Sequence, residues 1–377
     1  MWRLVLVVAL LCLGSEAHIS CKNEKDEDVD WYILYKFPEI KDKLNGGDYI
    51  YIDSKGNEKN SKPINDKDSF LANTLKPILT NPPGCGFISY NDQPPTGSSV
   101  SDKMGHSKGV VMLDKTHLVW LLHSTPNFPS KRDTNDFYPV EGLKFGQTFI
   151  CVTLPHTANG AIVKHLQFIN AYVFDHQPDG FPNNVKVTKN KLQPSLNTND
   201  QSQLYGDLKT AGGVELKHFY KKTSKYGLVG DLYVTIAKEL QDDLYVQTWG
   251  RQFCRDFTYC PTNGHKVFNV EDIDTQNIGK WNRVNDHSKW CVPTNNNKHW
   301  ICIADSNRAV SQYERPGGAL CIKNEKAAET FRGFVVKTVE NCPPTEASSS
   351  GSSTKRKADT NSQGSSSHSA PVKIGKT

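Results

Sequence analysis

The tripeptide His-Ser-Lys occurs twice in this chain, as GHSKGVV at residues 105–111 and as DHSKWCV at residues 286–292. Side chains two positions apart lie on the same face of an extended strand. His106 and Lys108 therefore form one couple, and His287 and Lys289 form a second. Two imidazoles can supply a nucleophile and an acid, and two ammonium groups can neutralise an anion. This set suits displacement at the phosphorus of a phosphodiester, with lysines in place of a divalent metal.

The sequences after the two tripeptides are also alike. Each continues through a polar turn into an apolar strand, LVWLL in the first copy and WICIA in the second. Polar residues then recur at matching positions, His123 with Asp305 and Asn127 with Asn307. A single His-x-Lys arises by chance, but two copies in similar contexts favour two equivalent halves that share one site.

The beginning of the chain indicates where the protein resides. Residues 1–17, MWRLVLVVALLCLGSEA, place Arg3 before an apolar run and end in small residues, which predicts a signal peptide. An apolar run of about ten residues is too short for a membrane anchor. We therefore expect a soluble protein of the secretory route, lysosomal or secreted, with no membrane association.

Cysteine content and charge agree with that location. Of the 10 cysteines, Cys12 leaves with the signal peptide, so an odd number remains and at least one thiol is free or pairs between chains. No CxxC pair occurs, which disfavours a cysteine-based zinc site. The net charge of +5 and the 12 histidines make the protein strongly cationic in an acidic lumen, so polyanions are expected partners.

The 377 residues leave room for one large or two ordinary domains. Residues 232–247 begin as an amphipathic helix. Residues 345–377 are rich in serine and lysine, and we expect a disordered tail. Seven short runs rich in β-branched and aromatic residues predict strands, at 31–37, 49–53, 86–90, 109–114, 117–123, 147–153 and 299–305. The pattern indicates a mixed α/β or α+β fold.

Beyond the two tripeptides, several longer segments resemble the deoxyribonuclease II family, and in particular an invertebrate member of it. They include VDWYILYKFP, YNDQPP, WLLHSTPNFP, WICIADSNR and RPGGALC. These segments follow one another in the expected order from Cys21 to Cys342. The resemblance covers nearly all of that range, and we expect residues 18–344 to form the catalytic domain.

The resemblance implies a phospholipase D-like fold of two pseudo-symmetric halves, roughly residues 21–165 and 166–344, each a β-sheet flanked by helices. It implies metal-independent, cofactor-free cleavage of double-stranded DNA at acid pH through a phosphohistidine, leaving 3′-phosphate and 5′-hydroxyl ends. The catalytic set is then His106, Lys108, His287, Lys289 and His123. Asp305, Asn307, Asn127 and Asp114 are auxiliary candidates.

The same resemblance implies disulfides between Cys21 and Cys151, between Cys302 and Cys321, and between Cys342 and either Cys254 or Cys260. Two departures from the family pattern are visible. The usual phospholipase D motif has an acid four residues after its lysine, whereas Asp114 lies further from Lys108 and no such acid follows Lys289. The chain also lacks an Asn-x-Ser/Thr acceptor, which disfavours sugar-dependent sorting to lysosomes.

Two other functions remain open at this point. One is a phospholipase D-type phosphodiesterase acting on lipid head groups, and the other is a secreted DNA-binding or effector homologue without catalysis. The presence of both histidines and both lysines favours the nuclease. The sequence leaves open which histidine is the nucleophile, whether the protein is a homodimer, and whether its duty is to degrade apoptotic or ingested DNA.

Overall fold

The predicted strands are apolar along their whole length because both of their faces are buried. The computed structural model describes residues 18–56, 62–80, 85–183, 185–194, 204–224, 227–276, 278–338 and 342. In β3 (Trp31–Lys36) every residue is buried, and the same holds for β6 (Lys108–Leu113). The expected signal peptide and the expected disordered tail lie outside the described residues.

The first large sheet has seven strands in the order β4-β3-β8-β7-β6-β5-β9, and each neighbouring pair is antiparallel. Besides β3 and β6 it contains β4 (Tyr49–Asp53), β5 (Gly86–Asn91), β7 (His117–His123), β8 (Gln147–Pro155) and β9 (Val173–Gln177). The strands predicted in this half are confirmed. The strand β9 was not predicted.

The second large sheet has nine strands, of which eight follow the order β12-β13-β19-β18-β17-β14-β15-β16, and β20 pairs with β15. Its strands are β12 (Tyr205–Lys209), β13 (Glu215–Tyr220), β14 (Leu244–Gln247), β15 (Val267–Asp274), β16 (Lys280–Asn282), β17 (Trp290–Pro293), β18 (Trp300–Ala304), β19 (Gly318–Lys323) and β20 (Val335–Thr338). Two short ribbons are added by β1 (Cys21–Lys22) with β2 (Asp28–Val29) and by β10 (Lys186–Thr188) with β11 (Lys191–Gln193).

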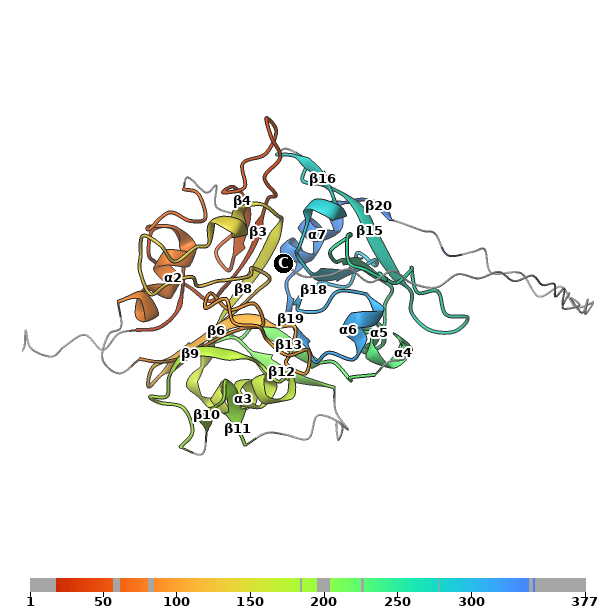
Figure 1. The fold of residues 1–377 in the computed structure, drawn as a ribbon. Helices are drawn as coiled ribbons and strands as arrows, with labels where there is room; N and C mark the ends of the chain where they lie inside the picture. The colour runs from red at the N-terminus through yellow and green to blue at the C-terminus, as the bar shows by residue number, and fades with distance from the viewer. Residues whose placement is uncertain are drawn as a thin grey trace, which may run out of the picture. The chain divides into compact units, whose positions relative to one another are not determined.

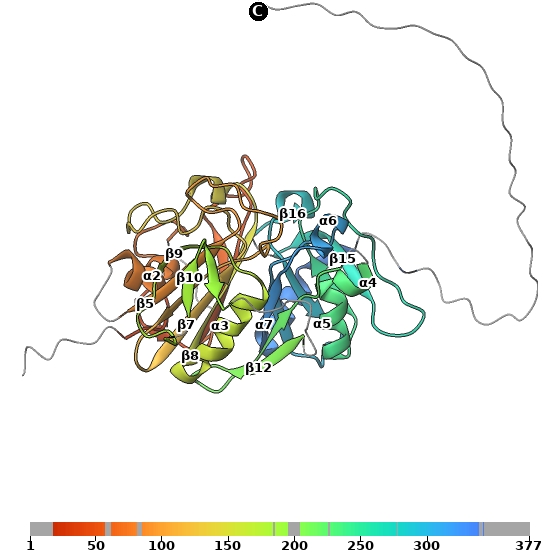
Figure 2. The same cartoon turned by 60° about the horizontal axis from the view of Figure 1, so that its bottom comes forward.

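Helices form layers around the two sheets. Those with about two turns or more are α2 (Phe70–Leu79), α3 (Asn159–Phe168), α5 (Leu232–Leu240) and α7 (Glu325–Gly333). The shorter ones are α4 (Gly227–Gly230), α6 (Val310–Tyr313), η1 (Val140–Leu143), η2 (His156–Ala158) and η3 (Arg283–Asn285). Figures 1 and 2 show α2 outside the first sheet, α3 and α7 between the sheets, and α5 outside the second sheet.

Alternation along the strands assigns each side chain to one of these layers. In β3, Ile33 and Tyr35 enter the central core, whereas Leu34 packs on the α2 side. The central core also receives Trp290 and Ile303 from the second sheet. Both sheets therefore bury one face against the same core, which fixes them as one body up to Cys342.

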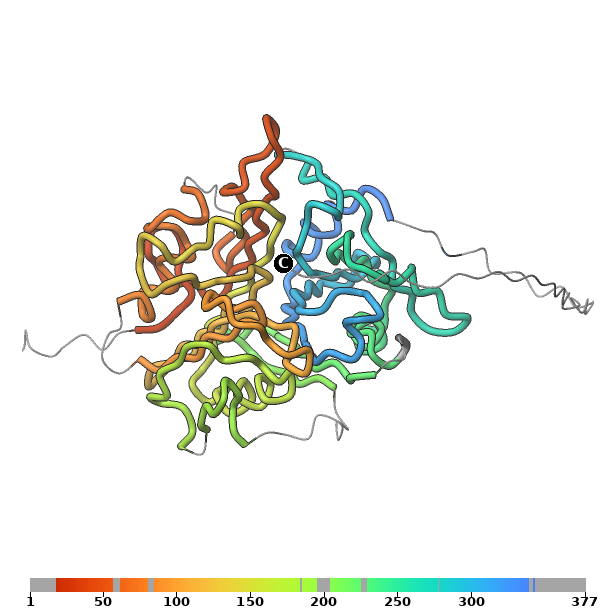
Figure 3. Tube along the Cα trace, in the orientation of Figure 1, coloured from red at the N-terminus to blue at the C-terminus, as the bar shows by residue number. Residues whose placement is uncertain are grey.

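The observed fold is mixed α/β, as predicted, with several sheets and few helices. Figure 3 follows the chain from the first sheet into the second. The approximate boundary at residue 165 falls inside α3, and β9 still pairs with β5 of the first sheet. No helix of the described segments combines the length and the apolar character that a membrane crossing requires.

Three disulfides join the described residues. Cys21 pairs with Cys151, and Cys302 pairs with Cys321 across neighbouring strands, as expected. Cys342 pairs with Cys260, so the alternative partner Cys254 is wrong. Cys254 is an exposed free thiol, and Cys85 and Cys291 are buried free thiols. Such pairing is typical of a protein that folds in an oxidising compartment.

Candidate active site

The two His-Ser-Lys segments meet at one cleft of about 390 Å³, as the sequence repeat predicted. His106 and Lys108 reach it from the start of β6, and His287 and Lys289 reach it from the segment before β17. The cleft is also lined by Asp92, Gln93, Val100, Asp102, Ser124, Pro126, Trp249, Gln252, Asn307, Gln312 and Arg315. Residues from both large sheets thus form a single polar site.

Each segment is held by the backbone of the other half. The N–H of His106 donates to the Pro316 carbonyl at 2.9 Å, and the N–H of His287 donates to the Gly146 carbonyl at 2.9 Å. Gly146 in turn donates its own N–H to the Asn285 carbonyl at 2.9 Å. The site therefore exists only when the two halves are packed together.

The imidazole of His106 has a defined tautomer. Its Nδ1 lies 2.6 Å from the carbonyl oxygen of Asp305. A carbonyl can only accept, so Nδ1 carries the proton and Nε2 presents a lone pair. Desolvation in the cleft, aided by Lys108 and Lys289, lowers the pKa of His106 to about 3, although Asp92 opposes the shift.

The imidazole of His287 is clamped between aromatic rings. Phe145 stacks on it with ring centroids 3.9 Å apart, and Trp249 packs at 4.6 Å. Its Nε2 is buried and has no hydrogen-bond partner among the described residues. Desolvation and then the neighbouring Lys289 and Lys108 lower the pKa of His287 to about 3. A buried polar atom without a partner costs free energy, and a phosphate oxygen would satisfy it.

A buried carboxylate that the sequence reasoning missed neutralises the first lysine. Asp92 follows β5 directly and accepts from the Lys108 ammonium, while Arg315 from the second half lies 2.9 Å from its other oxygen. Although burial opposes ionisation, Lys108, His106 and Arg315 hold the pKa of Asp92 well below its usual range. The segment YNDQPP contains this residue, and the register of Asn91 with Lys108 places Asp92 beside the site.

Within the part of the chain that the structure describes, the second lysine has no such carboxylate partner. Lys289 donates to the carbonyl of its own neighbour His287 at 2.5 Å. Burial and then the charge of Lys108 lower the pKa of Lys289 to about 7. The two lysines therefore differ in electrostatics although their sequence contexts are similar.

Asp286, also missed as a functional residue, anchors the second segment. Its Oδ2 accepts from Trp281 Nε1 at 2.8 Å and from the Tyr35 hydroxyl of the first sheet, and its Oδ1 accepts from the Ser288 N–H at 2.9 Å. A buried carboxylate with three donors fixes the backbone on either side of His287. The sequence feature that could have indicated this role is the position of Asp286 directly before the second His-Ser-Lys tripeptide.

The auxiliary candidates of the second half lie at the site. Asn307 lines the cleft, accepting from the Trp249 N–H and donating to Gln252, both at 3.2 Å. The side chain of Asp305 accepts from the Gly318 N–H at 3.1 Å. Burial raises the pKa of Asp305 well above its usual value, which favours the neutral form of the carboxyl group. Its backbone carbonyl is the part that touches the imidazole.

The corresponding residues of the first half, Asn127 and His123, do not line the cleft. Asn127 does not line the cleft; it adopts a positive φ of 57° and its N–H donates to the Gln93 carbonyl at 2.8 Å. His123 is also outside the lining, buried against Phe128 and Phe149, with Nδ1 accepting from the Thr125 N–H at 3.2 Å. Its catalytic role stays a prediction.

The assignment of Asp114 to the site is wrong. Asp114 follows the last residue of β6, whereas Lys108 is the first. Six residues of extended strand span roughly 20 Å, so this carboxylate cannot support either imidazole. It instead accepts from the N–H groups of Ile19, Thr116 and His117 in the turn after β6.

Comparisons with known proteins identify the same region. The family model for deoxyribonuclease II matches residues 20–342. Human deoxyribonuclease-2-beta is 30% identical over 345 residues, covering 87% of this chain and 94% of that protein. Plancitoxin-1 of Acanthaster planci is 30% identical, covering 88% of this chain and 95% of that protein.

A search of solved structures gives yeast tyrosyl-DNA phosphodiesterase, with a TM-score of 0.30 and 11% identity, covering 59% of this chain and 69% of that one. A likeness of this size supports no inference about fold or function. The sequence match, in contrast, runs through both His-Ser-Lys segments and both large sheets. The chain therefore belongs to the deoxyribonuclease II family and is a nuclease of the hydrolase class.

Proposed function

We propose that this nuclease is an acid endodeoxyribonuclease that cleaves double-stranded DNA without a metal and leaves 3′-phosphate and 5′-hydroxyl ends. The observation that carries the proposal is the cleft that gathers His106, Lys108, His287 and Lys289. The name of the human relative supports DNA as the substrate. A phospholipase D-like architecture of two pseudo-symmetric halves belongs to the same proposal.

Cleavage proceeds in two displacements. Nε2 of His106, whose lone pair is left free by the Nδ1 bond to Asp305, attacks phosphorus. The new N–P bond replaces the P–O5′ bond, and His287 gives its proton to the departing 5′-oxygen. Water, deprotonated by His287, then attacks phosphorus, breaks the N–P bond and releases the 3′-phosphate.

The cations stabilise charge on phosphorus in both steps. Lys108 and Lys289 line the cleft with the histidines, so their ammonium groups can bind the non-bridging phosphate oxygens. Asp92 forms a buried ion pair with the Lys108 ammonium group and so holds it in place. Arg315 holds Asp92 from the opposite side and adds positive charge at the rim of the cleft.

The preference of the enzyme for acid pH follows from the protonation states of the two imidazoles. Before the substrate binds, desolvation and the lysines keep both histidines neutral, with pKa values lowered to about 3. A phosphate anion between the lysines opposes this repulsion and raises the pKa of the histidine that must act as the acid. Protonation of His287 in the complex is then favoured by low pH.

The location follows from the signal peptide expected at residues 1–17 and from the three disulfides. Both fit the secretory route, ending in lysosomes or outside the cell. There the enzyme degrades DNA from dying cells or ingested material.

Plasmid digestion tests the proposal. Wild-type protein is assayed at pH 5 and pH 7.5, with and without EDTA, and the new ends are analysed for phosphate. We expect faster cleavage at pH 5, no effect of EDTA, and 3′-phosphate ends. His106→Ala and His287→Ala should each lose at least about 10³-fold in activity, whereas His265→Ala, outside the cleft, should retain it.

Each of these measurements can contradict one part of the proposal. Full loss of activity in EDTA would show that lysines do not replace a metal. Substantial cleavage by either alanine variant would remove the phosphohistidine mechanism. Tight DNA binding by wild-type protein without any cleavage would favour the non-catalytic alternative.

A further inference from the structure

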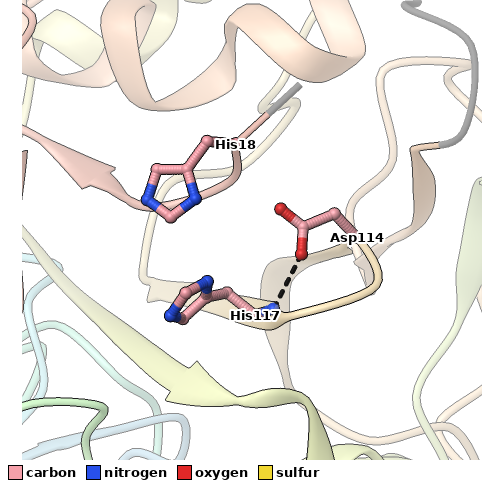
Figure 4. A group of neighbouring side chains, drawn as sticks. All are labelled: His18, Asp114 and His117. Atoms are coloured by element: carbon pink, nitrogen blue, oxygen red, sulfur yellow. Dashed lines mark hydrogen bonds between the residues drawn. The ribbon is translucent and has the colours of Figure 1, made fainter. Parts of the chain in front are cut away.

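A second group of chemically active side chains lies away from the cleft, where the first described residues meet the turn between β6 and β7. His18, Asp114 and His117 each place one potential ligand atom so that all three lie within 4.8 Å of one another (Figure 4). The group belongs to no part of the proposed mechanism. From its geometry we propose that it is a binding site for a divalent transition-metal ion of the zinc class.

The hydrogen bonds around His117 leave one of its ring nitrogens free to bind a metal ion. Thr116 Oγ1 donates its only proton to Asp114 Oδ1 at 2.8 Å. The contact of 2.9 Å between this hydroxyl and His117 Nδ1 must therefore be a bond that Nδ1 donates. Nε2 of His117 is left with a lone pair, which is the form of imidazole that binds a metal.

His18 also keeps one ring nitrogen free, but here it is Nδ1 and not Nε2. Its Nε2 lies 3.2 Å from Asp28 Oδ2, and a carboxylate can only accept. Nε2 then carries the proton, and Nδ1 presents its lone pair. A histidine held by a carboxylate through its second nitrogen is the usual arrangement around protein-bound zinc.

Asp114 supplies the oxygen ligand. Its Oδ1 accepts three hydrogen bonds, from the Thr116 N–H and hydroxyl and from the His117 N–H. Its Oδ2 accepts one, from the Ile19 N–H at 2.8 Å, and so retains a lone pair. These hydrogen bonds hold the Asp114 carboxylate in one orientation without a bound ion.

The set of donors suits zinc. Two imidazoles and one carboxylate are a common three-ligand set for Zn²⁺, with bonds of roughly 2.0–2.2 Å. Tetrahedral bonds of that length bring ligand atoms roughly 3.4 Å apart, so the group, with ligand atoms within 4.8 Å of one another, must close around the ion. The His18 side chain is 47% exposed and can make that movement. Water, or the α-amino group of His18 after cleavage behind Ala17, completes the coordination.

The ion would tie the N-terminal residue to the β6–β7 turn. That turn lies at the end of β6 opposite Lys108, so the ion has no contact with the catalytic cleft. Metal binding here is consequently compatible with cleavage that does not need a metal. It is also independent of whether the proposed nuclease mechanism holds.

Calorimetric titration with Zn²⁺ at pH 7.5 tests the site, on protein that begins at His18 and carries no histidine tag. We expect one Zn²⁺ per chain, and Co²⁺ should give the visible absorption of a tetrahedral site. His18→Ala and His117→Ala should each weaken binding by at least about 100-fold, and Thr116→Val, which removes an orienting group, by about 10- to 100-fold. His176→Ala, at an exposed histidine of β9, is the matched control and should bind as wild type does.

The site is disproved if wild-type protein binds no Zn²⁺, or if His18→Ala binds it with unchanged affinity and stoichiometry. His18→Ala decides the question even if His117→Ala fails to fold, because the His18 side chain is half-exposed. Plasmid cleavage by His18→Ala in EDTA should equal that of wild type. This readout separates the metal site from the catalytic cleft.

Discussion

The imidazole of His106 donates through Nδ1 to the backbone carbonyl of Asp305, 2.6 Å away and on the other sheet of the protein. In many catalytic sites a carboxylate orients such an imidazole. Here the carboxyl group of Asp305 accepts from the Gly318 N–H, and burial raises its pKa. The orientation of His106, the proposed nucleophile, therefore depends on how the two halves pack.

Replacement of Asp305 by asparagine tests this relationship. Asparagine keeps the backbone carbonyl and an oxygen that can accept from the Gly318 N–H. Because burial favours the neutral form of the native carboxyl, we expect Asp305→Asn to retain plasmid cleavage within about threefold of wild type. A loss greater than about 100-fold in a folded variant would show that an ionised carboxylate is required.

Removal of the charge on Asp92 should destabilise the whole protein. Asp92→Asn leaves the buried ammonium of Lys108 without its partner and releases Arg315. Breaking one side of a buried ion pair lowers the free energy of unfolding by about 3–5 kcal/mol. Urea denaturation measures this change. Asp136→Asn, which breaks an exposed pair with Lys131, is the control and should leave the midpoint unchanged.

DNA affinity should depend on the protonation of Lys289. With its pKa lowered to about 7, Lys289 is charged below pH 7 and loses its proton as the pH rises above it. In a His106→Ala background, the Kd for a DNA duplex should rise by up to about tenfold per pH unit above pH 7. Fluorescence anisotropy from pH 5 to pH 8.5 measures this dependence.

Arginine at position 289 stays charged throughout that range. Lys289→Arg should therefore flatten the rise in Kd, whereas Lys103→Arg, at an exposed position, should leave it as it is. An equally steep rise in the Lys289→Arg protein would assign the titration to another group.

A methyl group at Gly146 should displace His287. A Cβ at this position would lie 2.6 Å from Asp286 Oδ1, and the Asp286 carboxylate is held by Tyr35, Trp281 and Ser288. The segment that carries His287 must then move, and a shift of about 1 Å can reduce kcat by about 100-fold. Gly160→Ala, where a Cβ meets nothing within 4 Å, is the control. Full activity in Gly146→Ala would show that this contact does not position the imidazole.

Much of the fold follows from local sequence. The runs at 49–53 and 117–123 become β4 and β7 with the predicted bounds, because strands buried on both faces are continuous in apolar residues. The repeat of His-Ser-Lys likewise predicted the two couples of the cleft. Local sequence did not predict β9, whose residues VFDHQ are partly exposed at the edge of the first sheet, nor any strand of the second sheet other than β18.

The partners of the catalytic groups depended on the tertiary structure. The sequence offered Asp114 as the candidate for the acid of the phospholipase D motif, although it lies six residues after Lys108 instead of four. Strand β6 carries it to the opposite end, and Asp92, which comes earlier, lies beside Lys108 through the pairing of β5 with β6.

The sequence by itself determined the kinds of groups available, two histidines and two lysines in repeated contexts, and the strands that carry them. Only the tertiary structure decided which backbone carbonyl orients His106, which lysine is neutralised, and which ring nitrogens are free. The reason is that pKa values and tautomers depend on atoms within a few ångströms in space. For His106 that atom, the carbonyl oxygen of Asp305, comes from the other half of the chain.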